Sequence, residues 1–251
     1  MIKALLISLL TATLAHGQYD ARTADYLRAW RIGAANQIDP IWNGLVAYWS
    51  MDSVSGKTVF DKFGDNDATA VNSPLFGSEY GKHLDGMSTS SNSLSHLSAD
   101  SAWSGGDVTI NFWLYVDEVN EYPRLFFTGD TATTNGLRLL RDGGNLELRS
   151  TIDGVAQARK RAPFSLDTWI MVTFGVSGGV PFLVTDVTNT ASDGSGTLNA
   201  GALTVTMIGR HAAGTNPVVS YFDEVAIWNR ALSSNEVSEL YNNGAGKFYT
   251  P

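Results

Sequence analysis

The chain has 251 residues, of which 43% are hydrophobic and 17% charged, a composition that indicates a globular protein and excludes a disordered one. Its formal net charge is −8, so we expect no nucleic-acid partner, because binding to phosphates needs clustered Lys and Arg. The chain has no cysteine, which excludes disulfides, thiolate metal ligands and a cysteine nucleophile.

The first segment has the layout of a secretory signal peptide. Lys3 precedes an apolar run over residues 4–15, and small residues up to Gly17 predict cleavage before Gln18. The run is too short for a transmembrane helix, so we expect no membrane span. We predict that residues 1–17 direct the protein to the exterior or the cell surface. The alternative is an uncleaved hydrophobic arm that docks on a neighbouring subunit, as in a virion.

Residues 18–40 are predicted to form a separate helical segment. Asp20 can cap its start, and Asp39 followed by Pro40 ends it. Its apolar side chains recur at helical spacing and form one stripe, made of Thr23, Tyr26, Leu27, Trp30 and Ala34. This helix either docks on its own domain or contacts a protein partner through residues 19–40.

From residue 41 onward the hydrophobic period changes to two, which is typical of strands. Residues 108–116 place Val108, Ile110, Phe112, Leu114 and Val116 on one face. Similar runs follow at 137–140, 146–148, 169–176, 182–185, 203–208 and 218–228, separated by Gly-rich turns. We interpret the short basic cluster at 159–161 as a solvated loop. The pattern predicts an all-β fold over residues 41–251, an antiparallel β-sandwich of the jelly-roll type.

One helix is expected within this domain, near its C-terminal end. Ser233 and Glu236 have the spacing of a capping box, in which each side chain accepts a hydrogen bond from the other residue's backbone amide. Val237 and Leu240 supply an apolar face, and Gly244 suits the left-handed stop. We predict a helix of about two turns over residues 233–242 that packs on the sandwich.

The strand before this helix contains two adjacent acids. Strict alternation places Asp223 on the face of Val225 and Glu224 on the face of Phe222. The two carboxylates then point to opposite faces and cannot flank one glycosidic bond, so we predict no catalytic pair. A buried carboxylate without partners is costly, and we therefore expect one of them to meet a metal ion or backbone amides.

Several stretches of the chain resemble a known family: "GLVAYWSMDSVSGKTVFDKFGDNDATAV", "GKHLDG", "VTINFWLYV", "DTWIMVTF" and "YFDEVAIWNRALSSNEVSELYNNG". The chain is similar to the concanavalin A-like lectin/glucanase superfamily, and within it to bacterial laminin-G-like modules related to pentraxins. The resemblance spans nearly all of residues 44–246 and implies a jelly roll of two curved sheets. Glucanases of the superfamily carry a Glu-x-Asp-x-x-Glu strand that this sequence lacks, so we predict that the protein is not an enzyme.

The resemblance also implies one bound calcium near the start of the domain. Residues 61–67 place several side-chain oxygens around a glycine, which suits a hard cation. We predict a structural calcium held by Asp61, Asp65 and Asp67 together with Asp223 of the last strand. The alternative is an acidic surface turn, since Asp, Asn and Gly are common turn formers.

A non-catalytic protein of this kind would bind glycans through aromatic rings that stack on sugars. Trp103, Tyr122 and His211 lie in or beside loops and are the candidate carbohydrate-binding residues, with Tyr80 as a further one. The remaining strand tryptophans are expected in the core: Trp49, Trp113, Trp169 and Trp228. We predict an exported glycan-binding or adhesion module. The alternative is a structural or decoration protein of a surface assembly or phage particle, attached through residues 1–40.

Overall fold

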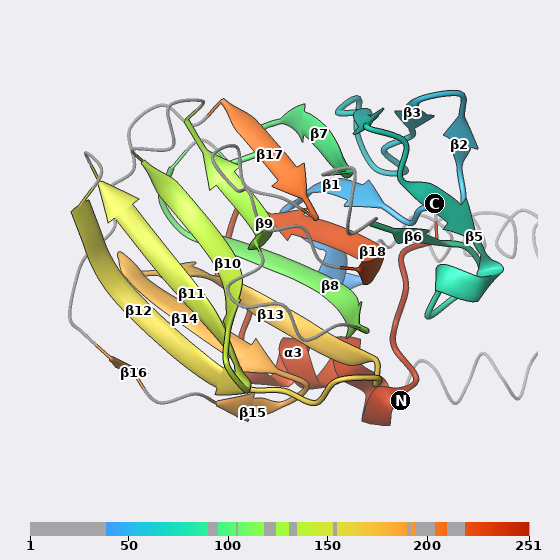
Figure 1. Cartoon of the computed structure of the whole chain (residues 1–251). Coiled ribbons are helices and arrows are strands. Elements are labelled where there is room, and N and C mark those ends of the chain that lie inside the picture. Colours follow the sequence, from blue (N-terminus) through green and yellow to red (C-terminus); the bar gives the residue numbers. More distant parts are fainter. Residues whose placement is uncertain are drawn as a thin grey trace, which may run out of the picture. The chain divides into compact units, whose positions relative to one another are not determined.

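The computed structural model describes residues 39–89, 95–103, 105–117, 124–130, 135–152, 155–189, 192–193, 204–209 and 219–250 (Figure 1). The chain divides into two units, residues 1–43 and 44–251. Of the first unit only residues 39–43 are described, and there Pro40–Trp42 form a 3-10 turn (η1) capped by Asp39. The predicted signal peptide and the body of the predicted N-terminal helix lie outside the described residues.

The second unit consists of two antiparallel sheets that pack face to face (Figure 1). In its described part, the first sheet has eight strands in the order β15-β14-β13-β8-β18-β6-β5, with β1 also pairing with β18. Its strands are β1 (Leu45–Trp49), β5 (Leu75–Gly77), β6 (Gly86–Ser88), β8 (Val108–Val116), β13 (Ile170–Ser177), β14 (Val180–Thr185), β15 (Thr188–Asn189) and β18 (Ser220–Trp228).

The second sheet has ten described strands in the order β16-β12-β11-β10-β9-β17-β7-β4-β3-β2. Its strands are β2 (Val54–Ser55), β3 (Thr58–Val59), β4 (Ala68–Val71), β7 (His96–Asp100), β9 (Arg124–Gly129), β10 (Gly136–Asp142), β11 (Asn145–Ile152), β12 (Val155–Pro163), β16 (Ser192–Asp193) and β17 (Val205–Ile208). The predicted all-β antiparallel sandwich is confirmed, and its arrangement is consistent with a jelly roll.

The core lies between the two sheets, and β8 supplies its centre. The predicted inward face of β8 is confirmed, since all five of its apolar residues belong to the buried core cluster. Phe112 is fully buried, and its ring centroid lies 5.6 Å from that of Phe126 in the opposite sheet. Two further rings, Phe222 and Phe174, lie 5.7 and 6.0 Å from it. The contact of Phe112 with Phe126 therefore joins the two sheets, and the contacts with Phe222 and Phe174 lie within the eight-stranded sheet.

The predicted C-terminal helix is present as α3 (Ser234–Tyr241), and Ser233 and Glu236 form both bonds of the capping box. The left-handed residue that ends it is Asn242, with φ 45°, two positions before the predicted Gly244. Tyr241 stacks on Trp113 of β8, with ring centroids 6.1 Å apart, so α3 covers the outer face of the eight-stranded sheet. Two further 3-10 turns are η2 (Ser78–Tyr80) and η3 (Asn242–Gly244).

The basic cluster at residues 159–161 lies in a strand, and its prediction as a solvated loop was wrong. These residues belong to β12, which pairs along its length with β11. Strand alternation sends Arg159 and Arg161 to the outer face while Lys160 is largely buried. Lys160 and Ala162 occupy inward positions of β12. Because neither is a large apolar residue, the apolar pattern of this strand is weak in the sequence.

Within the described part of the chain, no helix has the length and apolar character needed to cross a membrane.

Candidate functional site

Four aromatic rings gather at one end of the outer face of the eight-stranded sheet. Tyr115 and Tyr221 lie almost parallel, with ring centroids 5.1 Å apart and an interplanar angle of 6°. Trp169 lies 5.8 Å from Tyr115, and Tyr80 lies 5.3 Å from Tyr221. All four side chains are partly exposed to solvent. We call this group, Tyr80, Tyr115, Trp169 and Tyr221, the aromatic platform.

The strand register explains why these rings meet. Tyr115 of β8 is paired directly with Tyr221 of β18, and Trp169 immediately precedes Ile170, which pairs with Leu114. Adjacent strands are about 4.8 Å apart, so outward-pointing rings on three neighbouring strands form a continuous surface. The fourth ring, Tyr80, comes from the η2 turn. The platform is thus set by the sheet and is largely preformed.

Carboxylates lie at the rim of the aromatic platform. Asp117 and Asp167 are both exposed. Partial burial, followed by the charge of Asp117, raises the pKa of Tyr221 above its usual value. Desolvation, followed by the charge of Asp167, does the same for the pKa of Tyr115. Both phenols therefore keep their protons at neutral pH, and the rim offers hydrogen-bond donors and acceptors beside an apolar ring surface.

Of the three predicted carbohydrate-binding residues, the structure describes Trp103 alone. Trp103 is only 2% exposed, belongs to the core cluster and donates its indole N–H to the Gly106 carbonyl, so its ring has no free face for a sugar. Tyr122 and His211 lie outside the described residues. Tyr80, the further candidate, does belong to the aromatic platform.

Of the strand tryptophans predicted to be core, Trp49, Trp113 and Trp228 are buried. Trp169 is not buried, because it sits just before β13 on the outward side of the sheet. The sequence contained one indication of the aromatic platform: the alternation of β8 places Tyr115 on the outer face, between two buried residues.

The two adjacent acids of β18 occupy a β-bulge, which strict alternation did not predict. The pairing with β8 shifts between Asp223 and Ala226, and Glu224 has φ 55°. Because the bulge adds a residue, Phe222 and Val225 both face the core. The predicted placement of Asp223 on the face of Val225 was therefore wrong. Both carboxylates are buried: Asp223 is 0% and Glu224 4% exposed.

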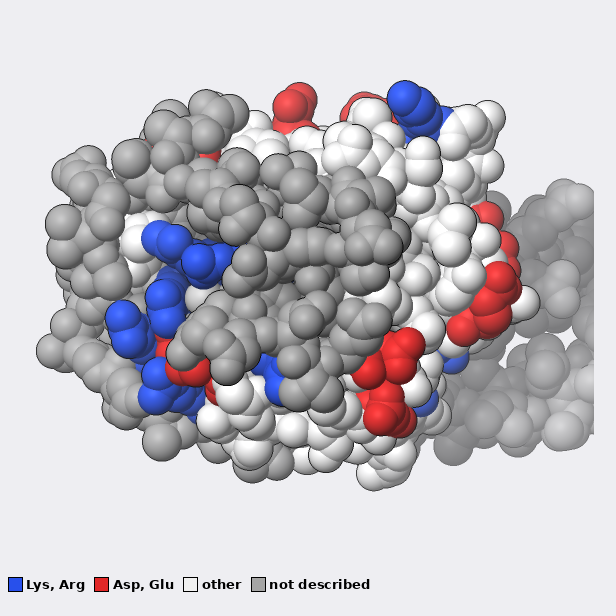
Figure 2. Space-filling view, viewed as in Figure 1, with Lys and Arg blue, Asp and Glu red and all other residues white. Residues whose placement is uncertain are grey.

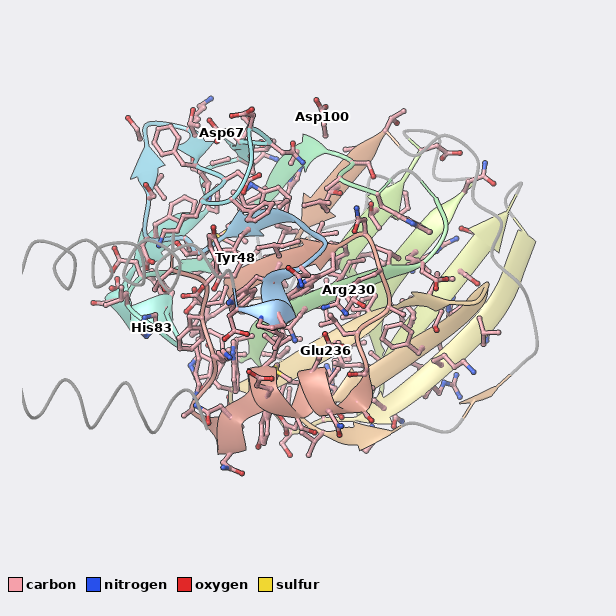
Figure 3. The ribbon with its side chains drawn as sticks, turned by 180° about the vertical axis from the view of Figure 1, so that it is seen from behind. Tyr48, Asp67, His83, Asp100, Arg230 and Glu236 are labelled. Carbon is pink, nitrogen blue, oxygen red and sulfur yellow. The ribbon has the colours of Figure 1, made fainter. Side chains whose placement is uncertain are left out.

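The buried acids serve as anchors for other segments. One oxygen of Asp223 accepts hydrogen bonds from the backbone amides of Lys82 and His83, each at 2.8 Å. This bond pair fixes the segment directly after η2 and so helps to place Tyr80 against the sheet. Glu224 accepts a hydrogen bond from the hydroxyl of Tyr48 on β1; Tyr48 is labelled in Figure 3. Burial, followed by the charge of Glu224, raises the pKa of Asp223 to about 9. Burial also raises the pKa of Glu224, to about 8.

In the predicted calcium-binding turn, backbone amides already occupy the side-chain oxygens of Asp61. Its carboxylate accepts hydrogen bonds from the amides of Tyr48 and Phe63 at 2.9 Å and from that of Asn66 at 3.3 Å. Asp67 in turn accepts the amide of Asp61 at 2.9 Å.

Asp65 is exposed in that turn. The described residues contain no group of three or more His, Cys, Asp or Glu arranged to hold a metal ion. The calcium site at residues 61–67 therefore stays a prediction. Among the four predicted calcium ligands, Asp223 has a buried oxygen, Oδ1, without a hydrogen-bond partner in the described structure.

The two antiparallel sheets that pack face to face define a β-sandwich. The family model described as the concanavalin A-like lectin/glucanases superfamily matches residues 88–238. The chain belongs to this superfamily, which confirms the resemblance seen in the sequence. No curated protein matches the sequence.

Several solved structures are similar to the chain. One is domain 4 of AbnA, an extracellular arabinanase from Geobacillus stearothermophilus, in complex with arabinotriose; it has a TM-score of 0.63 and 17% identity, and the match covers 78% of this chain and 97% of that one. Trypanosoma rangeli sialidase has a TM-score of 0.62 and 16% identity, over 81% of this chain and 34% of that one.

The receptor-binding domain of botulinum neurotoxin mosaic serotype C/D has a TM-score of 0.64 and 12% identity, over 81% of this chain and 51% of that one. The chain thus spans about a third of the sialidase and half of the toxin domain. At these identities the likeness establishes the fold alone.

Proposed function

We propose that this protein is a non-catalytic glycan-binding module and that the aromatic platform is its binding surface. The observation that carries the proposal is the contact of four partly exposed rings, with Tyr115 and Tyr221 stacked at 5.1 Å. Flat apolar rings bordered by hydroxyls and carboxylates match a sugar, which has an apolar ring face and polar edges. A large preformed aromatic surface on rigid strands costs little entropy to present.

The similar structures support a glycan as the ligand. Domain 4 of the arabinanase was solved with arabinotriose, and the other two neighbours are a sialidase and the receptor-binding domain of a toxin. Their names concern those proteins, and the low identities transfer only the fold. The ligand of this chain is therefore inferred from its own rings and rim carboxylates.

The buried acids support a non-catalytic role. Asp223 and Glu224 are the adjacent carboxylates that the sequence singles out, and neither faces solvent. Asp223 is held by two backbone amides and Glu224 by a tyrosine hydroxyl. A glycosidase needs two carboxylates that flank an accessible bond, and this pair is used instead to tie segments together.

The test uses single ring deletions on the platform with a matched control. Tyr115→Ala and Trp169→Ala each remove a stacking surface, and Phe60→Ala removes an aromatic ring that is 41% exposed elsewhere. Calorimetric titration with arabinotriose and with neutral gluco-oligosaccharides should give about tenfold weaker binding for the platform variants. Phe60→Ala should bind as the parent does. Equal affinity for all three variants, at unchanged melting temperature, would disprove the platform as the site.

We also propose that the module is exported, on the layout of residues 1–17. The alternative, a structural or decoration protein attached through residues 1–40, requires that segment to be retained. Intact-mass analysis of the protein from its native source separates the two. A chain that begins at Gln18 supports export, and a chain that retains Met1 supports an assembly arm or a protein contact through residues 19–40.

We further propose a structural calcium, with Asp223 as its central ligand in place of the turn at residues 61–67. Its support is the buried, unpartnered Oδ1 of Asp223, close to the charges of Asp52 and Glu224, which both raise the pKa of Asp223. An ion there would supply the missing partner and favour the ionised form of Asp223, which burial and the charge of Glu224 oppose. Melting should then shift upward on adding calcium chloride and back with a chelator. An Asp223→Asn variant should lose that shift, and no shift in the parent would refute the site.

A further inference from the structure

The outer face of the ten-stranded sheet carries a row of arginines that the aromatic platform does not use. Arg138 of β10 is paired directly with Arg149 of β11, which is paired with Arg159 of β12. Strand alternation turns all three away from the core, because Leu137 and Leu148 beside them face inward. We call Arg138, Arg149 and Arg159 the arginine row. Like charges opposite one another on neighbouring strands destabilise a sheet, so a row of this kind is costly without a ligand.

Two further arginines flank the row. Arg124 of β9 is paired with Leu140, and Arg161 of β12 is paired with Glu147. Glu147 is fully buried and binds Arg149 and the Nε of Arg161, the latter at 2.7 Å. Arg161 also binds Asp142 at 2.6 Å. Figure 2 shows Lys and Arg side chains gathered over this part of the molecule.

The described carboxylates do not balance this charge. The arginine row and its two flanking arginines carry five positive charges. The described carboxylates paired with them are Glu147 and Asp142, and these two bind only Arg149 and Arg161. Arg159 is in register with Asp193 of β16. Arg124 and Arg138 have no ion pair with a described residue. The Nη1 of Arg124 and the Nε of Arg138 are buried and have no hydrogen-bond partner in the described structure.

Unpaired guanidinium nitrogens that are shielded from water indicate a missing anion. Burial, followed by the charges of neighbouring arginines, lowers the pKa of Arg138. Burial and the charge of Arg149 lower that of Arg124 in the same way. A buried donor without a partner costs free energy, and the oxyanions of a bound ligand would supply acceptors for these two nitrogens. Guanidinium is the side chain best suited to bind carboxylate or sulfate by paired hydrogen bonds.

We propose that the arginine row, together with Arg124, forms a second binding site for an anionic polysaccharide. These arginines hold the polysaccharide through its carboxylate or sulfate groups. The spacing favours a polymer with repeated charges, because the row places guanidiniums on three successive strands about 4.8 Å apart. The recessed nitrogens favour a thin chain over a flat lipid surface, which would meet only projecting side chains. This site lies on the opposite sheet from the aromatic platform and does not depend on it.

The test removes the two unpaired arginines and leaves the ion pairs of Glu147 intact. Arg124→Gln/Arg138→Gln is compared with Lys57→Gln/Lys247→Gln, which removes the same charge away from the arginines: Lys57 lies in the turn between β2 and β3 at the other edge of the sheet, and Lys247 follows α3. Retention is measured on polygalacturonate, which carries carboxylates, and on heparin, which carries sulfates as well. The arginine variant should lose at least about tenfold in affinity, and the lysine variant should not. The difference between the polymers identifies which oxyanion is bound. Added salt should weaken binding of the parent.

Three results would overturn the inference. The first is equal retention of the arginine and lysine variants, and the second is no retention of either acidic polymer by the parent. The third is capture by phosphatidylserine vesicles in the absence of polymer binding. A falling melting temperature would explain a loss by unfolding, but relief of like-charge repulsion should leave the arginine variant at least as stable as the parent. Tyr115→Ala separates the two sites, since it should weaken binding to neutral sugars and leave retention on acidic polymers unchanged.

Discussion

The outer faces of the two sheets differ in chemistry although the strands beneath them follow the same alternation. On the eight-stranded sheet, Tyr115 and Tyr221 stack in register and acids lie at the rim. On the ten-stranded sheet, Arg138 and Arg149 occupy the equivalent directly paired positions. The inward faces of both sheets together carry the buried apolar core cluster. The core therefore constrains only one side of each strand and leaves the other side free to vary in its chemistry.

The two sheets also treat a buried carboxylate in opposite ways. Glu147 and Asp223 are both 0% exposed. Burial acts to raise the pKa of Glu147, but hydrogen bonds from Arg149 and Arg161 outweigh it, and the pKa is lowered. Asp223 has two backbone amides and no described cation, and its pKa is raised. The partner, and not burial alone, therefore decides whether a buried acid is charged.

The largest loss of stability should come from a substitution in the core, on which both sheets pack. Phe112→Ala removes a fully buried ring that contacts Phe126 of the opposite sheet, so we expect the free energy of unfolding to fall by about 3–5 kcal/mol. Urea denaturation measures this loss, and binding to neutral and acidic glycans should decline together. Phe60→Ala, at a ring that is 41% exposed, is the control and should change stability by less than about 0.5 kcal/mol. Similar losses for both variants would contradict the assigned core.

A smaller loss of stability, from contacts within the ten-stranded sheet, is expected from Glu147→Gln. Loss of the carboxylate leaves Arg149 and Arg161 without their shared partner, and because both guanidiniums are partly solvated we expect a cost of about 2 kcal/mol at pH 7. Urea denaturation at neutral pH measures it. Glu239→Gln, which removes an exposed ion pair with Lys247, should cost less than about 1 kcal/mol.

The same variant has a defined pH dependence. The folded pKa of Glu147 lies below the unfolded value of about 4.3, so its stabilisation is fully present above that pH and is lost as pH falls through the folded pKa. The difference in stability between the parent and Glu147→Gln should therefore be constant from pH 7 to about pH 5 and narrow at lower pH. A difference that grows on acidification would show that the arginines do not hold this carboxylate in its charged form.

The sequence was sufficient for features that depend on neighbours along the chain. The alternation of β8 gave its buried face correctly, and the capping box of Ser233 and Glu236 located the start of α3. Both are local patterns whose physics acts over a few residues. Gly-rich turns likewise gave the hairpin between β10 and β11, where Gly143 has φ 60°.

The binding surfaces depend on strand register, which local patterns do not specify. Tyr115 and Tyr221 are far apart in sequence and meet only because β8 and β18 pair. Arg138 and Arg149 likewise become neighbours through the pairing of β10 and β11. The bulge at Asp223 reversed the expected faces after it, because one additional residue changes the side of every following side chain. The apolar strand at residues 169–176 predicts that Trp169 lies in the core, but Trp169 lies just before that strand begins.

The smallest loss of stability should come from removing the N-terminal cap of α3. Its effect on binding should be confined to the eight-stranded sheet. Figure 3 shows Arg230 and Glu236 close together at the start of this helix, where they form an ion pair of 2.5 Å. Ser233→Ala removes the side-chain acceptor for the amide of Glu236, and we expect a loss of about 1 kcal/mol in urea denaturation.

Ser233→Asp should retain most of this stability, because aspartate also caps helices. Ser238→Ala, which removes an exposed hydroxyl inside the helix, is the control and should be nearly neutral. Since Tyr241 of α3 stacks on Trp113, loosening of the helix should reach the outer face that carries the aromatic platform. Retention on acidic polymers should be unchanged, because the arginine row lies on the other sheet. If Ser233→Ala weakened binding to acidic polymers as much as to neutral sugars, the two faces would not be independent.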